Sequence, residues 1–284
     1  MKPALFRAAA AFLIVTALLA VASLPAAAQT SNIPKSLQVK ILSIRPHDPQ
    51  AYTQGLLIHD GFFYESTGLR GESSLRKVDM QTGEVLQRLD LPNEFYAEGL
   101  ALVGDKLVQI TYTEQLAFVY DLKTFEKLNT FTYIGEGWGL CYDGTSLYMS
   151  NGTPFITERD PETFKPIRTF EIKLGGVAVN NLNELECVGD YIYSNIWFTD
   201  TILQIDKRDG KIVALIDATN LLTQQERDLA GQWGTFNGIA YDETTQHFFV
   251  TGKYWPWMFE VEFVEDIPRG YITPTPLAVA TPNE

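Results

Sequence analysis

Five segments of the chain each begin an apolar stretch with a residue that could contact a ligand. These residues are an amide, a carboxylate, an indole and two more amides: Gln54, Glu98, Trp138, Asn183 and Asn237. A second set follows 13 to 16 positions later and includes two aromatic residues and an ammonium group: Thr67, Tyr112, Asn151, Trp197 and Lys253. A carboxylate and an ammonium group between aromatic walls can move protons and polarise a carbonyl group.

The spacing of these segments indicates an internal repeat. When Gly55, Gly99, Gly139, Glu184 and Gly238 are taken as equivalent, successive copies start 44, 40, 45 and 54 residues apart. Each copy contains short apolar stretches separated by turns rich in Asp and Gly. Four short strands in about 40 to 50 residues are typical of a propeller blade. The sequence therefore predicts an all-β fold, a five-bladed β-propeller.

The last copy has three recognisable strands rather than four. We expect its fourth strand at residues 37–44, where apolar and polar residues alternate. The last blade would then be closed by an N-terminal strand, which removes an exposed sheet edge. Because the first strand of each blade lines the central channel, the residues that begin these strands should surround one mouth. We expect a pocket for a small polar ligand there.

The N-terminus has the pattern of a secretory signal peptide. Lys2 and Arg7 precede an apolar run, which ends in Ala26-Ala27-Ala28. The alternative is an uncleaved membrane anchor, because the run is nearly long enough to span a bilayer. After cleavage we expect a periplasmic or secreted protein without membrane attachment. The predicted domains are a signal peptide at 1–28, a linker at 29–36, the catalytic propeller at 37–264 and a Pro-rich, extended tail at 265–284.

Composition and charge narrow the possible partners. The net charge of −13 becomes −15 when Lys2 and Arg7 leave with the signal peptide, which argues against nucleic acid as a partner. The three histidines are not at ligand spacing, and we predict no metal and no cofactor. Cys141 and Cys187 are expected to be buried free thiols, with a disulfide as the alternative. We expect a monomer.

Two short segments stand outside the repeat. Residues 220–235 lengthen its last step, and they predict a short helix that is capped by Thr219 or Asn220. His47-Asp48-Pro49 is interpreted as a turn rather than a catalytic pair. The chain has no Gly-x-Ser-x-Gly motif and no Gly-rich phosphate loop. The chemistry open to the pocket is therefore proton transfer and electrostatic stabilisation rather than a serine nucleophile.

Structural interpretations of the same residues remain open. Glu98 would then be a solvated channel acid or the cap of a strand end, and Trp138 and Trp197 would be ordinary core residues. Lys253 would pair with a surface acid. Asn183 and Asn237 would bond only to turn backbone.

Eight segments, in order from about His47 to Phe263, resemble the plant and bacterial glutaminyl cyclases (glutamine cyclotransferases). The segments are 47–56, 65–69, 97–100, 137–140, 182–186, 195–197, 237–240 and 250–256. The resemblance implies a five-bladed propeller, unrelated to the zinc-dependent animal enzymes, that converts N-terminal glutaminyl residues to pyroglutamyl and releases ammonia. It implies site roles for Tyr52, Gln54, Glu98, Trp138, Asn183, Trp197 and Lys253.

On this reading the partners are peptides or proteins that begin with Gln. Glu98 is expected to carry a proton from the α-amine to the departing NH₂ group. Lys253, the second predicted catalytic residue, would polarise the carboxamide oxygen with help from Gln54 and Asn183. The two tryptophans would enclose the side chain, and Tyr52, Tyr112 and Asn237 complete the predicted binding set. Tyr112 replaces a tryptophan of the plant members, a change that keeps the wall aromatic but opens the possibility of a different substrate preference.

Two other functions stay open from the sequence. One is a non-enzymatic propeller that binds a peptide or glycan across the same mouth. The other is a lactonase-type hydrolase, in which Glu98, Asn183 and Asn237 would hold a cation through oxygen atoms.

Overall fold

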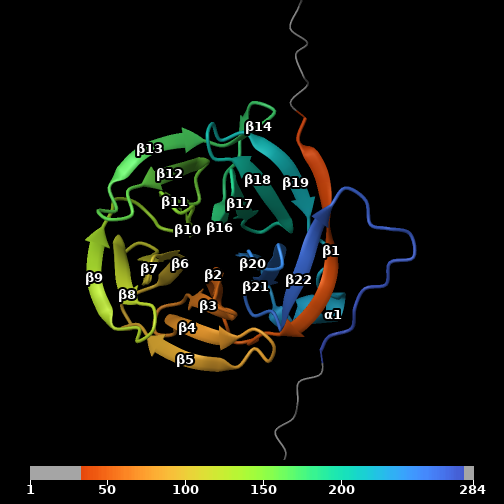
Figure 1. Ribbon diagram of the computed structural model, residues 1–284, viewed down its shortest axis with the longest axis horizontal. Helices are drawn as coiled ribbons and strands as arrows, with labels where there is room; N and C mark the ends of the chain where they lie inside the picture. Colours follow the sequence, from red (N-terminus) through yellow and green to blue (C-terminus); the bar gives the residue numbers. More distant parts are fainter. Residues whose placement is uncertain (1–32, 278–284) are drawn as a thin grey trace, which may run out of the picture. The chain divides into compact units, whose positions relative to one another are not determined.

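The computed structural model describes residues 33–277; the predicted signal peptide lies outside them, as do the first residues of the linker and the end of the tail. The described chain is nearly all β-structure, with one short helix, α1 (Gln224–Ala230). Its sheets are set around a common centre in a propeller-like arrangement (Figure 1). Within these residues, no helix combines the length and apolar character needed to cross a bilayer.

Three sheets each contain four antiparallel strands that are consecutive in the chain. They coincide with the first three predicted copies of the repeat. The first sheet is β2 (Thr53–His59), β3 (Phe62–Thr67), β4 (Ser74–Asp79) and β5 (Val85–Asp90). The second is β6 (Ala97–Val103), β7 (Lys106–Thr111), β8 (Leu116–Asp121) and β9 (Lys127–Thr132). The third is β10 (Leu140–Tyr142), β11 (Leu147–Met149), β12 (Phe155–Arg159) and β13 (Pro166–Glu171).

A fourth sheet has eight strands in the order β16-β17-β18-β19-β1-β22-β21-β20. Strand β1 (Lys35–Pro46) joins its two halves, because it pairs parallel with β19 and antiparallel with β22. The strand predicted at 37–44 is thus confirmed, and it extends further at both ends. The other strands are β16 (Leu182–Val188), β17 (Tyr191–Ile196), β18 (Thr201–Asp206), β19 (Ile212–Asp217), β20 (Phe236–Asp242), β21 (His247–Gly252) and β22 (Trp257–Val264), and a separate hairpin is formed by β14 (Lys173–Leu174) and β15 (Val177–Ala178).

Strands β2, β6, β10, β16 and β20 lie innermost, and each contacts the next around the centre (Figure 1). Glycine makes this approach possible, because a Cβ atom on Gly99 would lie 2.4 Å from the Leu140 nitrogen. The fourth copy has Glu184 instead, and its buried carboxylate accepts hydrogen bonds from the backbone N–H groups of Ile239 (2.8 Å) and Leu56 (3.4 Å). The starts of the inner strands are thereby held together at one end of the centre.

A disulfide joins Cys141 to Cys187, so our expectation of free thiols was wrong. The two residues lie on the adjacent inner strands β10 and β16, and their Cα atoms are 5.4 Å apart. This separation suits a disulfide. Spacing along the chain gave no sign of it, since the two cysteines are 46 positions apart in sequence.

Replacing both cysteines by serine is expected to lower the free energy of unfolding by about 3 to 5 kcal/mol, because closing a loop of this length restricts the unfolded chain. Urea denaturation measures the change. A reducing agent should lower the midpoint of the unmodified protein and leave that of the double variant unaltered. Equal midpoints for the two proteins without reductant would contradict the prediction.

Helix α1 begins after Thr223, and the predicted caps Thr219 and Asn220 were wrong. Thr223 and Glu226 form a capping box, in which each side chain bonds to the backbone N–H of the other residue. Thr219 has a different role, because its backbone N–H donates to the Asp217 carboxylate at 2.9 Å and closes a turn. The sequence signal for a helix was therefore right, and its cap lies four residues later than Thr219.

The chain after β22 forms neither helix nor strand as far as residue 277. It runs beside β1, where the Leu277 N–H donates to the Ile44 carbonyl at 2.9 Å and the Tyr271 hydroxyl donates to the Ile41 carbonyl.

Candidate active site

A cavity of about 330 Å³ opens where the inner strands begin. Eight of the nine predicted site residues line it: Tyr52, Gln54, Glu98, Tyr112, Trp138, Asn183, Trp197 and Lys253. These residues come from all five copies of the repeat. The fold therefore brings together side chains that are up to 201 residues apart, Tyr52 and Lys253.

Asn237, the ninth predicted residue, is not part of the cavity lining. Its side-chain amide is fully buried and donates to the Thr53 carbonyl (2.9 Å) and to Gln54 Oε1 (3.4 Å). Asn237 thus fixes the position of Gln54 from behind. Thr67 and Asn151, from the second set, also lie outside the lining; Thr67 bonds to Ser74.

Four lining residues were absent from the predicted set: Leu69, Tyr96, Trp233 and Tyr254. Tyr96 precedes the Ala97-Glu98 motif and Tyr254 follows Lys253, so proximity to predicted residues could have found both. Trp233 belongs to the insertion at 220–235, which has no counterpart in the other copies. Repeat spacing therefore carried no signal for it.

Glu98 is a buried carboxyl group, 5% exposed, at the start of β6. Gln54 Nε2 donates to its Oε1 at 3.0 Å. Burial raises the pKa of Glu98 well above its ordinary value, Glu114 and Glu136 add to the rise, and Lys253 opposes it. A carboxyl group that holds its proton at higher pH than usual is suited to give a proton as well as to take one.

Lys253 is the cation of the site and is 2% exposed. Burial lowers its pKa to about 8, although Glu98 works in the opposite direction. Its Nζ lies 4.6 Å from the centroid of the Tyr52 ring and 5.8 Å from that of Trp197, and both rings favour a cation. Lys253 and Glu98 interact through charge.

The two tryptophans of the wall meet edge to face. The centroids of Trp138 and Trp197 are 5.3 Å apart and their planes are at 87°. Trp138 is oriented by a hydrogen bond from its Nε1 to Glu136 Oε2 (2.9 Å), and it packs on Gly152, where a Cβ atom would lie 2.5 Å from the indole. The adjoining segment thus needs glycine, which also supplies a φ of +74°.

Two polar atoms of the lining are buried without a partner among the described residues: the donor Trp197 Nε1 and the acceptor Asn183 Oδ1. Buried polar groups are normally hydrogen-bonded, and unpaired ones cost free energy. A donor and an acceptor left unpaired in one cavity indicate a ligand that has both. A carboxamide is such a group, since its oxygen accepts and its nitrogen donates.

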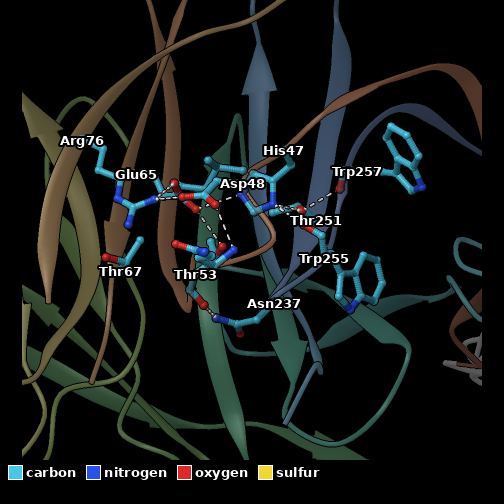
Figure 2. Close-up of polar contacts among 12 residues, drawn as sticks. His47, Asp48, Thr53, Glu65, Thr67, Arg76, Asn237, Thr251, Trp255 and Trp257 are labelled. Carbon is cyan, nitrogen blue, oxygen red and sulfur yellow. Dashed lines mark hydrogen bonds and ion pairs between the residues drawn. The ribbon is translucent and has the colours of Figure 1, made fainter. Parts of the chain in front are cut away.

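A buried polar network includes Thr53 and Thr251, which are close to Gln54 and Lys253 along the chain (Figure 2). The His47 Nε2 atom lies 3.0 Å from Glu65 Oε1, and the Thr53 hydroxyl donates to the same oxygen at 2.7 Å. On the other side, Thr251 contacts His47 Nδ1 at 3.3 Å. Thr53 immediately precedes Gln54, and Thr251 is two residues before Lys253. The network therefore positions the backbone of two site residues.

The same network explains the His47-Asp48-Pro49 segment. Asp48 accepts a hydrogen bond from the Ala51 N–H through its carbonyl (2.9 Å), so the predicted turn is confirmed. The Asp48 carboxylate forms an ion pair with buried Arg76 (2.8 Å), and the His47 ring pairs with the Glu65 carboxylate (3.0 Å). These residues do not line the cavity.

Replacing Glu65 by glutamine is expected to destabilise the fold by about 3 to 5 kcal/mol near pH 5.5, because one partner of a buried charge pair is lost. Burial disfavours the imidazolium of His47, but the Glu65 carboxylate outweighs burial and raises the pKa of His47 above 6.5. Burial also disfavours ionised Glu65, but His47 and Arg76 outweigh it and lower its pKa below 4.5.

The sign of each shift sets the pH window. The His47 contribution is complete below pH 6.5 and is lost as the pH rises through the raised pKa. The Glu65 contribution is complete above pH 4.5 and is lost as the pH falls through the lowered pKa. Urea unfolding across pH 4 to 9 should show the largest difference between the two proteins inside this window, whereas Glu265→Gln, in an exposed pair with Lys35, should change little. A pH-independent difference would contradict the assignment.

No group of three or more His, Cys, Asp or Glu side chains within residues 33–277 is arranged to hold a metal ion.

Comparison with known proteins shows the family of this chain. Residues 13–263 match the family model described as glutamine cyclotransferase. The chain belongs to the glutamine cyclotransferase family. It is 38% identical over 233 residues to the glutaminyl-peptide cyclotransferase of Arabidopsis thaliana, an alignment that covers 79% of this chain and 71% of the plant protein. It is also similar to the crystal structure of Myxococcus xanthus glutaminyl cyclase, with 37% identity, a TM-score of 0.75, and coverage of 81% of this chain and 98% of that one.

Proposed function

We propose that this member of the glutamine cyclotransferase family converts the N-terminal glutaminyl residue of peptides or proteins to pyroglutamyl and releases ammonia. One observation carries the proposal: the cavity combines Glu98 and Lys253, both buried and with pKa values shifted towards their neutral forms, with an unpaired donor and an unpaired acceptor. Together these groups match a carboxamide that must lose its nitrogen.

The glutaminyl side chain would lie against the wall that the two tryptophans form, because their edge-to-face contact leaves no space between the rings and rules out the enclosure expected from the sequence. Its carboxamide nitrogen would donate to Asn183 Oδ1, and its oxygen would accept from Trp197 Nε1 and from the ammonium group of Lys253. The first two contacts would pair atoms that are buried without a partner, and the third would pair the buried ammonium group of Lys253. The donors would stabilise the negative charge that develops on the oxygen during attack.

Ring closure then requires a proton to move between two nitrogen atoms. The substrate α-amine attacks the carboxamide carbon and forms the new C–N bond, while Glu98 accepts a proton from the amine. Glu98 returns this proton to the departing NH₂ group, so the old C–N bond breaks and ammonia leaves. The reacting atoms belong to one molecule, so the enzyme needs mainly to select the folded rotamer and manage the proton. An α-amine with a pKa of roughly 8 loses its own charge at little cost.

The same proposal covers the architecture and location of the chain. The eight-stranded sheet divides at β1 and β19 into two four-stranded halves, which with the three other sheets would make five blades, the last closed by β1. We propose that the protein is exported and acts as a monomer, with cleavage after residue 28. The disulfide supports an oxidising compartment.

A non-enzymatic peptide-binding or glycan-binding propeller is the competing function. Binding alone does not require a carboxyl group and an amine whose pKa values are shifted towards neutrality, whereas acid–base chemistry does. The cavity therefore favours the enzyme. The oxygen-ligated cation site of a hydrolase is less well supported, because Asn237 points away to Gln54.

Ammonia release from glutaminyl-glycine amide tests the function. We expect release from this peptide, and the pyroglutamyl product should be lighter than the substrate by the mass of ammonia, about 17 mass units. The N-acetylated peptide should release no ammonia, because it has no free amine. Activity should persist with a chelator. Absence of release from any Gln-initiated peptide would overturn the proposal and favour the binding propeller.

A further inference from the structure

An aromatic surface leads out of the cavity along one side of its mouth. Trp233 lines the cavity and is 48% exposed, and Phe198 is 54% exposed. The centroid of the Phe198 ring lies 6.0 Å from that of Trp233 and 4.2 Å from that of Trp197, which belongs to the cavity wall. The three rings form a continuous apolar surface from inside to outside, here named the aromatic shelf (Trp197, Phe198 and Trp233).

The shelf is fixed on both sides. Phe198 lies in the turn between β17 and β18, which is closed by a hydrogen bond from the Thr199 N–H to the Ile196 carbonyl at 3.0 Å. On the other side, Arg227 of α1 forms an ion pair with Asp200 at 3.1 Å. The insertion that carries Trp233 is thereby tied to the turn that carries Phe198.

Phe198 is also held in a conformation that bulky residues avoid. Its φ is 65°, in the left-handed region, and this costs roughly 1 kcal/mol or more for a residue with a Cβ atom. Asparagine or glycine would adopt this turn more readily, and more than half of the Phe198 side chain gains nothing from burial. An exposed aromatic residue kept at a strained position beside a site indicates a contact with something outside the fold.

The substrate geometry supplies that contact, provided the proposed function holds. The α-amine and carboxamide of the glutaminyl residue must lie inside, near Glu98 and Lys253, so the peptide chain leaves through the mouth. A cavity of about 330 Å³ is at the small end of ligand pockets, which suits one residue. The second side chain of the peptide then emerges at the level of Phe198 and Trp233.

We propose that the aromatic shelf binds the side chain of the second substrate residue, and that the enzyme prefers glutaminyl peptides in which this residue is aromatic or a large aliphatic. The shelf covers one face of that side chain and leaves the other in water, so the gain is a fraction of full burial. We expect kcat/KM for glutaminyl-phenylalanine amide to exceed that for glutaminyl-glycine amide by about tenfold. The difference should lie mainly in KM, because the contact is the same before and during ring closure.

Two variants test the shelf independently. Phe198→Ser and Trp233→Ser should each reduce the Phe-to-Gly ratio of kcat/KM to about threefold or less, and Trp233→Phe should restore most of it. The matched control is Leu229→Ser, since Leu229 is on α1 of the same insertion and is 78% exposed. This control should leave the ratio and the turnover unchanged. Far-UV circular dichroism and thermal unfolding report whether each variant is folded, because Trp233 also lines the cavity.

The outcomes separate this inference from the proposed function. Equal kcat/KM for the two peptides in the unmodified protein would overturn the role of the shelf but not the cyclase activity. The same conclusion would follow if both serine variants kept the full preference for the phenylalanine peptide. Absence of ammonia from both peptides would overturn the function itself, and the shelf with it.

Discussion

Replacing Glu98 by glutamine is expected to lower kcat by about 10²- to 10⁴-fold, the range that a positioned acid–base group contributes. Glutamine keeps the shape of the side chain and its contact with Gln54, but it cannot take a proton from the substrate amine. Because the lost interaction belongs to the transition state, kcat and kcat/KM should fall together. Steady-state ammonia release, with the dissociation constant for a glutaminyl peptide measured separately, checks both points.

The matched control for this variant is Glu94→Gln, an exposed acid in the loop before β6. It should leave kcat unchanged. Thermal unfolding of Glu98→Gln should occur at or above the temperature of the unmodified protein, because burial already disfavours the charge on Glu98. A kcat within threefold of the unmodified value would remove Glu98 from the mechanism.

Replacing Lys253 by methionine is expected to lower kcat by about 10²- to 10³-fold, as happens when one donor to a developing oxyanion is lost. The pH profile should also change. With a pKa of about 8, Lys253 is a cation below that pH and loses its charge above it, so activity of the unmodified protein should decline as the pH rises through about 8. In Lys253→Arg, which stays charged, the decline should disappear even if turnover is lower.

Stability distinguishes this effect from a damaged fold. The pKa of Lys253 is lower in the folded protein than its ordinary 10.5, so the charged form costs stability below pH 8 and this cost vanishes above pH 10.5. Lys253→Met should therefore unfold at a higher temperature than the unmodified protein at pH 7, while its activity falls. Lower stability together with lower activity would contradict the assignment, since the loss would then reflect disrupted packing.

A function that opposes stability is consistent with the rest of the site. The unpaired atoms of Trp197 and Asn183, the buried charges of Glu98 and Lys253 and the positive φ of Phe198 each carry a cost in the empty protein. The network around His47 and Glu65 supports the neighbouring backbone, and it does so with fully paired charges. The cavity and its mouth thus contain unfavourable groups, whereas the charged network behind them is paired.

The repeat in the sequence was enough to predict the set of strands and most of the site. Because equivalent residues in a ring of sheets occupy equivalent places, the spacing of Gly55, Gly99, Gly139 and Glu184 placed Gln54, Glu98, Trp138 and Asn183 around one mouth. The alternation at 37–44 likewise predicted a strand, and its partner β22 followed from the incomplete last copy. These inferences depend only on residue types that recur at regular spacing, and that spacing can be read directly from the sequence.

Tertiary structure alone decided where individual side chains point and which distant segments meet. Asn237 occupies the same repeat position as Glu98 but turns to Thr53, because the neighbouring strand offers it hydrogen bonds. Cys141 and Cys187 meet because two inner strands pack together, and Trp233 reaches the mouth because an ion pair anchors its insertion. Contacts of this kind depend on the separation between chain segments in space, which a one-dimensional pattern does not contain.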